Sequence, residues 1–390
     1  MWSFVLKCRT QSLVAISFGI GDSSARMRLG SAGLALLFFF SLASRGLAFD
    51  WTVIKHDGRD YIPIADVANF YRFTQADYSA DRVNLSGATI RMQGAMNSRE
   101  LYLNGLKFIL SYPVIKVDDK LLISRMDLSK LVEPVLRPAK IKAPQVRTVV
   151  LDAGHGGYDQ GARSLLGNEK DYALDVVLRA RELLTRSGYN VRLTRSGDVF
   201  IPLETRAEFA SHQSSSIFVS VHFNSGSRED AAGIETYCLA PRGVPATNDL
   251  FASLSDLRPS IGNARDPENI ALTTAMHAAL ITRTGAADRG IKRARFVVLR
   301  DDNIPGVLIE GGFLTNSTDR LRISTPAYRQ LMAQAILQGV QSYNRATQRV
   351  ASDQMVVKRI KPANDSDAME PKPSVWDPMQ NVYALPSSTN

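Results

Sequence analysis

Residues 148–157 read Thr-Val-Val-Leu-Asp-Ala-Gly-His-Gly-Gly, and this stretch decides the fold predicted for the chain. An apolar run with β-branched residues is typical of a buried strand. The run leads to His155, which has glycines on both sides; glycine lets the backbone turn sharply and allows another group to approach closely. A histidine at a strand end is well placed to bind a metal, but a lone one more often only hydrogen-bonds in its turn. The residues that accompany His155 therefore decide between the two interpretations.

Three further residues occupy comparable positions. His222 follows the apolar run 217–221, and Glu310 follows the run 307–309. Glu169 lies just before a predicted amphipathic helix. Because ligands gather at the carboxyl ends of strands in open α/β sheets, these side chains are expected to converge. Two imidazoles and one carboxylate form the open ligand set of a catalytic zinc, which leaves the fourth residue free to act as a base.

These motifs resemble those of the zinc-dependent N-acetylmuramoyl-L-alanine amidases. The resemblance implies that His155, Glu169 and His222 bind Zn²⁺ and that Glu310 is the catalytic carboxylate. It also implies a three-layer α/β fold with a groove at the strand ends. The resemblance covers about residues 147–345 and rests on four motifs that match in order, at 149–157, 167–174, 220–225 and 307–316.

The resemblance also implies the substrate, which is the amide between N-acetylmuramic acid and L-alanine in peptidoglycan. Zinc, a glutamate and amide hydrolysis are argued from the residues, but the identity of the bond is not. Two alternatives stay open: another zinc amidase or peptidase acting on cell-wall peptides, and a wall-binding protein whose accessory domain carries the main role. One departure from the family is Phe223, where many members carry a small residue; we expect it to leave the ligand His222 intact and to narrow the groove.

Strands and helices alternate through residues 147–346, which predicts an α/β catalytic domain with a mostly parallel sheet. Arg206 lies on one of the expected helices, and we expect it to form a structural ion pair. Cys238 is expected to be a buried core residue, and His277 is expected to be a structural residue. Strands are expected at 148–153, 190–194, 217–222, 234–238, 296–299 and 307–310, and helices at 170–187, 203–212, 269–283 and 325–343.

Residues 49–136 predict a small α+β accessory domain. Asn104-Gly105 between two apolar runs is a strong hairpin signal, and Ser124 is typical of a helix N-cap. The order of strands and helices resembles the copper-amine-oxidase N-terminal-like domain, although the segment's single histidine and its lack of cysteine indicate no copper. Residues 137–146 contain two prolines and several basic residues, and are expected to be a basic linker.

The two ends of the chain have a different character. Residues 1–48 combine basic residues, an apolar run and small residues at a cleavage position, which predicts a secretory signal peptide; Met27 is an alternative start. The apolar run is too short for a comfortable membrane span, so no stable span is expected after cleavage. We therefore expect an exported protein of the periplasm or cell envelope. Residues 347–390 are polar and rich in proline, and are expected to be a disordered tail.

Composition excludes some functions. Hydrophobic content of 45% and charged content of 22% are ordinary for a soluble domain, and the net charge is +9. No basic–aromatic array of the kind found in nucleic-acid binders is present, so no nucleic-acid partner is expected. The expected mature chain keeps only one of the two cysteines, and no internal disulfide is predicted.

The connection 239–268 is longer than a loop between neighbouring elements needs. It carries apolar Leu250, Phe251 and Leu254, and the carboxylates Asp249, Asp256 and Glu268. One interpretation is an inhibitory lid that covers the groove, with a carboxylate in the open zinc position until an activator protein displaces it. A glycan-holding segment and an inert surface loop are the alternatives.

Overall fold

The structure is a computed structural model that describes residues 49–78, 81–213, 215–249 and 253–348. The predicted signal peptide and nearly all of the predicted tail lie outside these residues, as do Leu250 and Phe251 of the long connection. Within the described ranges, no helix is long and apolar enough to cross a membrane.

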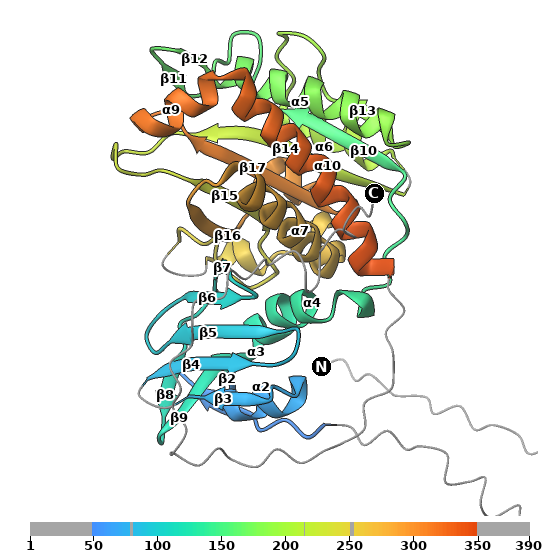
Figure 1. Ribbon diagram of the computed structural model, residues 1–390. Helices are drawn as coiled ribbons and strands as arrows, with labels where there is room; N and C mark the ends of the chain where they lie inside the picture. Colours follow the sequence, from blue (N-terminus) through green and yellow to red (C-terminus); the bar gives the residue numbers. More distant parts are fainter. Residues whose placement is uncertain (1–48, 79–80, 214, 250–252, 349–390) are drawn as a thin grey trace, which may run out of the picture. The chain divides into compact units, whose positions relative to one another are not determined.

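The N-terminal part of the described chain is built mainly from antiparallel strands (Figure 1). One sheet has the order β1-β2-β9-β8, and a meander follows the order β3 to β7. Asn104 and Gly105 both have positive φ at the turn between β6 and β7, which confirms the predicted hairpin. The Ser124 hydroxyl accepts a hydrogen bond from the Asp127 N–H, which confirms the predicted N-cap. The strands are β1 (Ile54–His56), β2 (Arg59–Pro63), β3 (Gln75–Asp77), β4 (Arg82–Ser86), β5 (Arg91–Ala95), β6 (Glu100–Leu103), β7 (Leu106–Ile109), β8 (Ile115–Val117) and β9 (Lys120–Ser124), and the helical segments are α2 (Ile64–Tyr71), α3 (Arg125–Asp127), η2 (Leu128–Val132), α4 (Glu133–Leu136) and η3 (Pro138–Lys140).

The rest of the described chain alternates strands and helices, and its six main strands extend the same sheet in the order β13-β10-β14-β17-β15-β16-β7. The first four strands are parallel to one another, whereas β15 runs antiparallel to β17 and β16 follows the direction of β15. The sheet is therefore mixed, with a parallel centre. Its strands are β10 (Thr148–Ala153), β13 (Asn190–Leu193), β14 (Ser216–Asn224), β15 (Ile234–Leu239), β16 (Asp288–Ala294) and β17 (Gly306–Phe313), and a separate short hairpin joins β11 (Arg163–Ser164) to β12 (Gly167–Asn168).

Helices cover both faces of this sheet, so the α/β class and the three layers are confirmed (Figure 1). Alternate residues of one strand reach different cores, as expected for a strand buried on both faces: Val149 and Leu151 lie in one cluster and Val150 in the other. On the first face lie α5 (Glu169–Arg186), α7 (Asp266–Thr284) and α10 (Pro326–Gln348). The second face carries α6 (Leu203–Ser211) and α8 (Val297–Arg300). Three shorter elements complete the described chain: α9 (Ser317–Ser324), which follows β17, and the turns η4 (Leu254–Leu257) and η5 (Ile261–Arg265), which precede α7.

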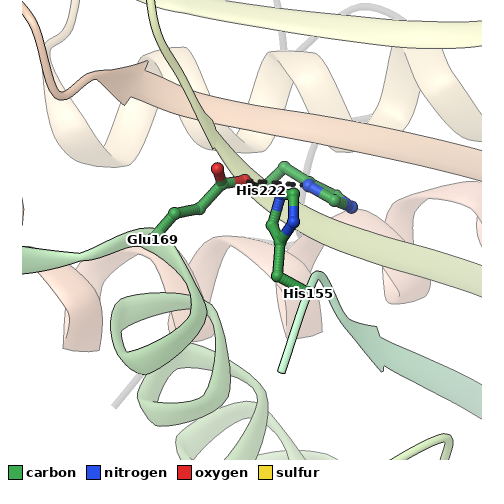
Figure 2. Close-up of side chains that lie close together, drawn as sticks. All are labelled: His155, Glu169 and His222. Atoms are coloured by element: carbon green, nitrogen blue, oxygen red, sulfur yellow. Dashed lines mark hydrogen bonds and ion pairs between the residues drawn. The ribbon is translucent and has the colours of Figure 1, made fainter. Parts of the chain in front are cut away.

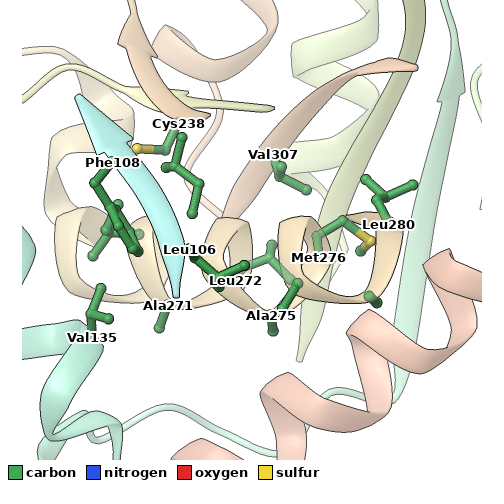
Figure 3. Packing of buried hydrophobic residues seen from close by; sticks show 14 of the residues in the cluster. Leu106, Phe108, Val135, Cys238, Ala271, Leu272, Ala275, Met276, Leu280 and Val307 are labelled. Atoms are coloured by element: carbon green, nitrogen blue, oxygen red, sulfur yellow. The ribbon is translucent and has the colours of Figure 1, made fainter. Parts of the chain in front are cut away.

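The N-terminal and C-terminal parts share one hydrophobic core (Figure 3). Leu106 and Phe108 of β7 belong to the same cluster as Ala271 and Leu272 of α7, and so does the buried Cys238 of β15, as predicted for that thiol. Residues 137–146, expected to be a linker, contact α10: the Val146 N–H donates to Asn344 Oδ1. The N-terminal part is thus attached to the C-terminal part by shared buried side chains as well as by the covalent connection.

The prediction of a strand at residues 296–299 is wrong. Residues 297–300 form α8, whose Val298 and Leu299 are buried in the second core, and the neighbouring strand is β16. The sequence of β16, Asp-Arg-Gly-Ile-Lys-Arg-Ala, has four charged residues and does not look like a buried strand. One of these charged residues, Arg293, is nevertheless buried, with 3% of its surface exposed. Its guanidinium donates to Ser111 Oγ and Asp127 Oδ1 in the N-terminal part, so a distant partner compensates for the buried charge.

Candidate active site

The structure brings the three predicted metal ligands together (Figure 2). His155 lies in the turn after β10, Glu169 is the first residue of α5 and His222 lies near the end of β14. Oε1 of Glu169 is 3.0 Å from Nε2 of His155 and 2.8 Å from Nδ1 of His222. One ligand atom from each of the three residues lies within 4.8 Å of the others, which is a spacing suited to one metal ion.

Two glycines leave the space that these side chains occupy. A Cβ on Gly154 would lie 2.2 Å from Cε1 of His222, so any larger residue there would collide with the imidazole. Gly161 has a φ of +64°, and a Cβ there would lie 2.5 Å from Oε2 of Glu169 and 2.6 Å from Cδ2 of His155. The backbone thus approaches all three candidate ligands at a distance that only glycine permits.

Two buried arginines hold the turn that carries His155. Arg206 of α6 is 2% exposed and donates to the carbonyl oxygens of Ala153 and His155 and to Oδ1 of Asp152. Arg195 donates to the carbonyls of Ala153 and Gly154. The predicted ion pair of Arg206 is confirmed by its 2.7 Å contact with Asp152. His155 itself has a φ of +59°, an uncommon conformation for a residue with a side chain, and these hydrogen bonds stabilise it.

Asp159 was missed in the sequence, because no periodic pattern marks a carboxylate in a loop. Its Oδ2 lies 2.8 Å from Nδ1 of His155. This contact fixes the orientation of the imidazole and leaves Nε2 facing Glu169. The only signal available was its position four residues after a candidate ligand.

Glu169 is buried and almost fully hydrogen-bonded. Oε2 accepts from the Ala162 N–H and Oε1 from the Phe223 N–H. Burial alone would raise the pKa of this carboxyl, but its hydrogen bonds with His155 and His222 hold the pKa well below the usual value. An ionised carboxylate between two imidazoles has the donor chemistry of a metal site.

Glu310 lies on β17, in register with His222 of β14 on one side and Glu235 of β15 on the other. Its Oε2 is buried and has no hydrogen-bond partner among the described residues. Burial raises the pKa of Glu310 well above its usual value, and the nearby charges of Glu169 and Glu235 raise it further, whereas Lys292 opposes them. A carboxyl with an unused oxygen beside a candidate metal site is itself a candidate for proton transfer.

Glu235 organises a polar network beside Glu310 that the sequence did not indicate. Its Oε1 accepts from Lys292 Nζ at 2.6 Å and from Arg289 Nε at 2.8 Å, and its Oε2 accepts from the Tyr237 hydroxyl at 2.7 Å. The two cations compensate for the buried carboxylate. They also place positive charge at the β15 side of the candidate site.

Phe223 does not narrow the groove, so that expectation is wrong. The side chain is 1% exposed and its ring packs against Tyr172, with ring centroids 6.1 Å apart. A Cβ on Gly311 would lie 2.9 Å from the Phe223 ring, so the neighbouring strand leaves room for it. The larger residue fills the core beneath the site and leaves the candidate ligand His222 in place.

Two of the three carboxylates of the long connection, Asp256 and Glu268, pair with arginines instead of with the candidate metal ligands. Because β15 is antiparallel to β17, Leu239 leaves the sheet at the edge opposite to Glu310. Asp256 pairs with Arg295 at 2.7 Å, and Glu268 is the first-turn acid of α7, 3.5 Å from Arg265. A metal-blocking role for Asp256 or Glu268 is therefore wrong in this structure.

Comparison with known proteins adds a family relationship. Residues 149–342 match the family model described as N-acetylmuramoyl-L-alanine amidase. The chain is 32% identical to N-acetylmuramoyl-L-alanine amidase AmiA of Escherichia coli over 245 residues, which cover 57% of this chain and 84% of that protein. It is 36% identical to the uncharacterized protein YqiI of Bacillus subtilis over 200 residues, covering 50% and 84% of the two chains. Among solved structures, amidase AmiC2 of Nostoc punctiforme matches with 30% identity over 52% of this chain and 99% of that one, at a TM-score of 0.43.

Proposed function

This chain belongs to the N-acetylmuramoyl-L-alanine amidase family, and we propose that it carries out this hydrolysis with a zinc ion held by His155, Glu169 and His222. It is an N-acetylmuramoyl-L-alanine amidase that cleaves peptidoglycan. The observation that carries the zinc proposal is the convergence of two imidazoles and one ionised carboxylate on a common point.

The residues present fit a zinc ion. The donor set has the nitrogen and oxygen ligands that zinc prefers and offers three protein ligands, as catalytic zinc sites do. Asp159 supplies the carboxylate that commonly orients a zinc-bound histidine. The glycines at 154 and 161 keep the centre free of other side chains.

The chain's own residues provide the remaining chemistry. When bound, zinc polarises a carbonyl and lowers the pKa of a water molecule. Glu310 takes the proton that water loses as it attacks the amide carbon, and the same carboxyl delivers a proton to the departing amine. The unpartnered, buried Oε2 of Glu310 supports this role, because no other protein group competes for it among the described residues.

The site of action and the partners follow from the substrate. We propose that the protein acts in the cell envelope, where peptidoglycan lies, after export directed by residues 1–48. An activator protein remains a prediction. So does the division into an accessory part (49–136), a linker (137–146) and a catalytic part (147–346).

Metal analysis and product analysis of the purified chain test the proposal. We expect one zinc per chain, lost in His155→Ala and His222→Ala and kept in the surface control His212→Ala. Mass spectrometry of digested peptidoglycan should show intact stem peptides that begin with L-alanine. Full zinc occupancy in both ligand variants would overturn the ligand assignment, and peptides cut at other bonds would indicate another cell-wall peptidase.

A further inference from the structure

The order of the strands sets the order in which the residues of the candidate site lie along the sheet. Along the edge of the sheet, the neighbouring strands β10, β14, β17 and β15 bring His155, His222, Glu310 and Glu235 into a row. Under the proposed function, Glu310 protonates the amine of the leaving peptide. That assignment puts the peptide on the β15 side of the row, and the sugar on the other side of the amide on the β10 and β13 side.

Two exposed aromatic side chains lie at the sugar end of this row. Tyr158 is three residues beyond His155, and Phe200 lies in the loop after β13, the strand that flanks β10. Their ring centroids are 4.5 Å apart and their planes are tilted by 30°. Tyr158 is 78% exposed and Phe200 is 37% exposed. In this stack the Tyr158 ring is the more open to solvent, and it lies three residues beyond the candidate ligand His155.

The pair is held rigidly to the metal-binding turn. The Gly157 N–H donates to Oδ1 of Asp198 at 2.8 Å, and Lys170 Nζ donates both to Oδ2 of Asp198 and to the Gly157 carbonyl. A Cβ on Gly157 would lie 2.8 Å from the Phe200 N, so the two loops are in close contact. The ion pair, the glycine and the ring stacking therefore fix the position of the aromatic face relative to His155.

We propose that Tyr158 and Phe200 form a platform on which a sugar ring of the glycan strand stacks during hydrolysis. The C–H groups on one face of a pyranose ring carry partial positive charge, and the π-face of an aromatic ring is negative. Tyrosine and phenylalanine lose little conformational entropy on binding, because each has only two side-chain torsions. The platform binds the part of the substrate that does not react, so it contributes to affinity more than to the chemical step.

Variants of the two rings separate this role from catalysis. Tyr158→Ala and Phe200→Ala are each expected to raise KM for peptidoglycan about tenfold, with kcat and zinc content unchanged, because uniform binding energy is removed. Tyr158→Phe keeps the ring and should keep the wild-type KM. Phe209→Ala removes a ring of similar exposure (36%) on α6 and is the matched control.

A binding measurement makes the test independent of turnover. The zinc-loaded wild-type chain should bind a chitin oligomer of N-acetylglucosamine in calorimetry, and both alanine variants should lose that binding. This oligomer has no lactyl group and therefore lacks the lactyl–L-alanine amide that the enzyme cleaves. Unchanged KM and unchanged oligomer binding in Tyr158→Ala and Phe200→Ala would overturn the platform. The platform rests on the proposed function, which fails separately if the wild-type chain releases no stem peptides from peptidoglycan.

Discussion

Nδ1 of His222 and Oε1 of Glu169 lie 2.8 Å apart, although Glu169 begins a helix and His222 lies in a strand 53 residues later. The contact exists because α5 starts at the edge where β10 and β14 end. A helix start also favours a carboxylate, since the N-terminal end of the helix dipole is positive. The position of Glu169 thus follows from the fold as much as from the chemistry of the site.

Asp159→Asn should weaken zinc binding without loss of the fold. The amide keeps the size of the carboxylate but loses the charge that orients the imidazole of His155. Loss of such a partner typically lowers metal affinity about 10–100-fold. Competition with a chelator of known affinity measures this change. Asp230→Asn, which removes a carboxylate from the exposed ion pair with Arg228, is the control and should bind zinc like the wild type.

Arg206→Met should destabilise the protein by about 3–5 kcal/mol, because it leaves the buried Asp152 carboxylate without its cation. The double variant Asp152→Asn/Arg206→Met should recover part of this loss, since it removes both charges. Urea unfolding of the three proteins measures the difference. Equal free energies of unfolding for the single and the double variant would show that the unpaired charge of Asp152 does not cause the loss of stability.

The buried Asp302 should make stability depend on pH. Burial raises its pKa to about 7, while Ser211 Oγ and the Ile304 N–H donate to its Oδ1. In the unfolded chain the carboxyl ionises near its usual value, so the stability present below about pH 4 is lost as the pH rises to about 7. The free energy of unfolding should fall by up to about 4 kcal/mol over this window.

Asp302→Asn provides the comparison, because an amide does not titrate. Urea unfolding at several pH values between 4 and 8 should show that the difference between variant and wild type changes with pH below 7 and is constant above it. A difference that stays constant from pH 4 to 8 would mean that Asp302 titrates normally in the folded protein.

The sequence predicted that His155, Glu169, His222 and Glu310 converge, because each follows an apolar run or begins a helix, and such positions meet at one edge of a parallel sheet. It did not predict Asp159 or Glu235, whose roles depend on contacts that no local pattern records. Strand β16 was missed for a related reason: Lys292 and Arg293 look like surface charges, but Glu235 and Asp127 compensate for them across the fold. Long-range pairing of charges is thus the main information that periodicity lacks.

The connection 239–268, for which a lid was one of three interpretations, shows a similar limit for strand topology. A long connection that follows a strand is predicted to lie at the site only if that strand ends there. Because β15 is reversed relative to β17, the connection begins at the opposite edge. Strand direction depends on pairing, which the hydrophobic pattern of a single strand does not specify.

The central claim is that Glu310 transfers protons beside a zinc ion held by His155, Glu169 and His222. The most direct test is the rate at which the Glu310→Gln variant releases stem peptides from peptidoglycan, measured together with its zinc content. We expect wild-type zinc content and a rate about 10²–10⁴-fold lower, because glutamine has nearly the same size but cannot accept a proton. The surface variant Glu208→Gln should retain full activity. A wild-type rate in Glu310→Gln at equal zinc content would contradict the account.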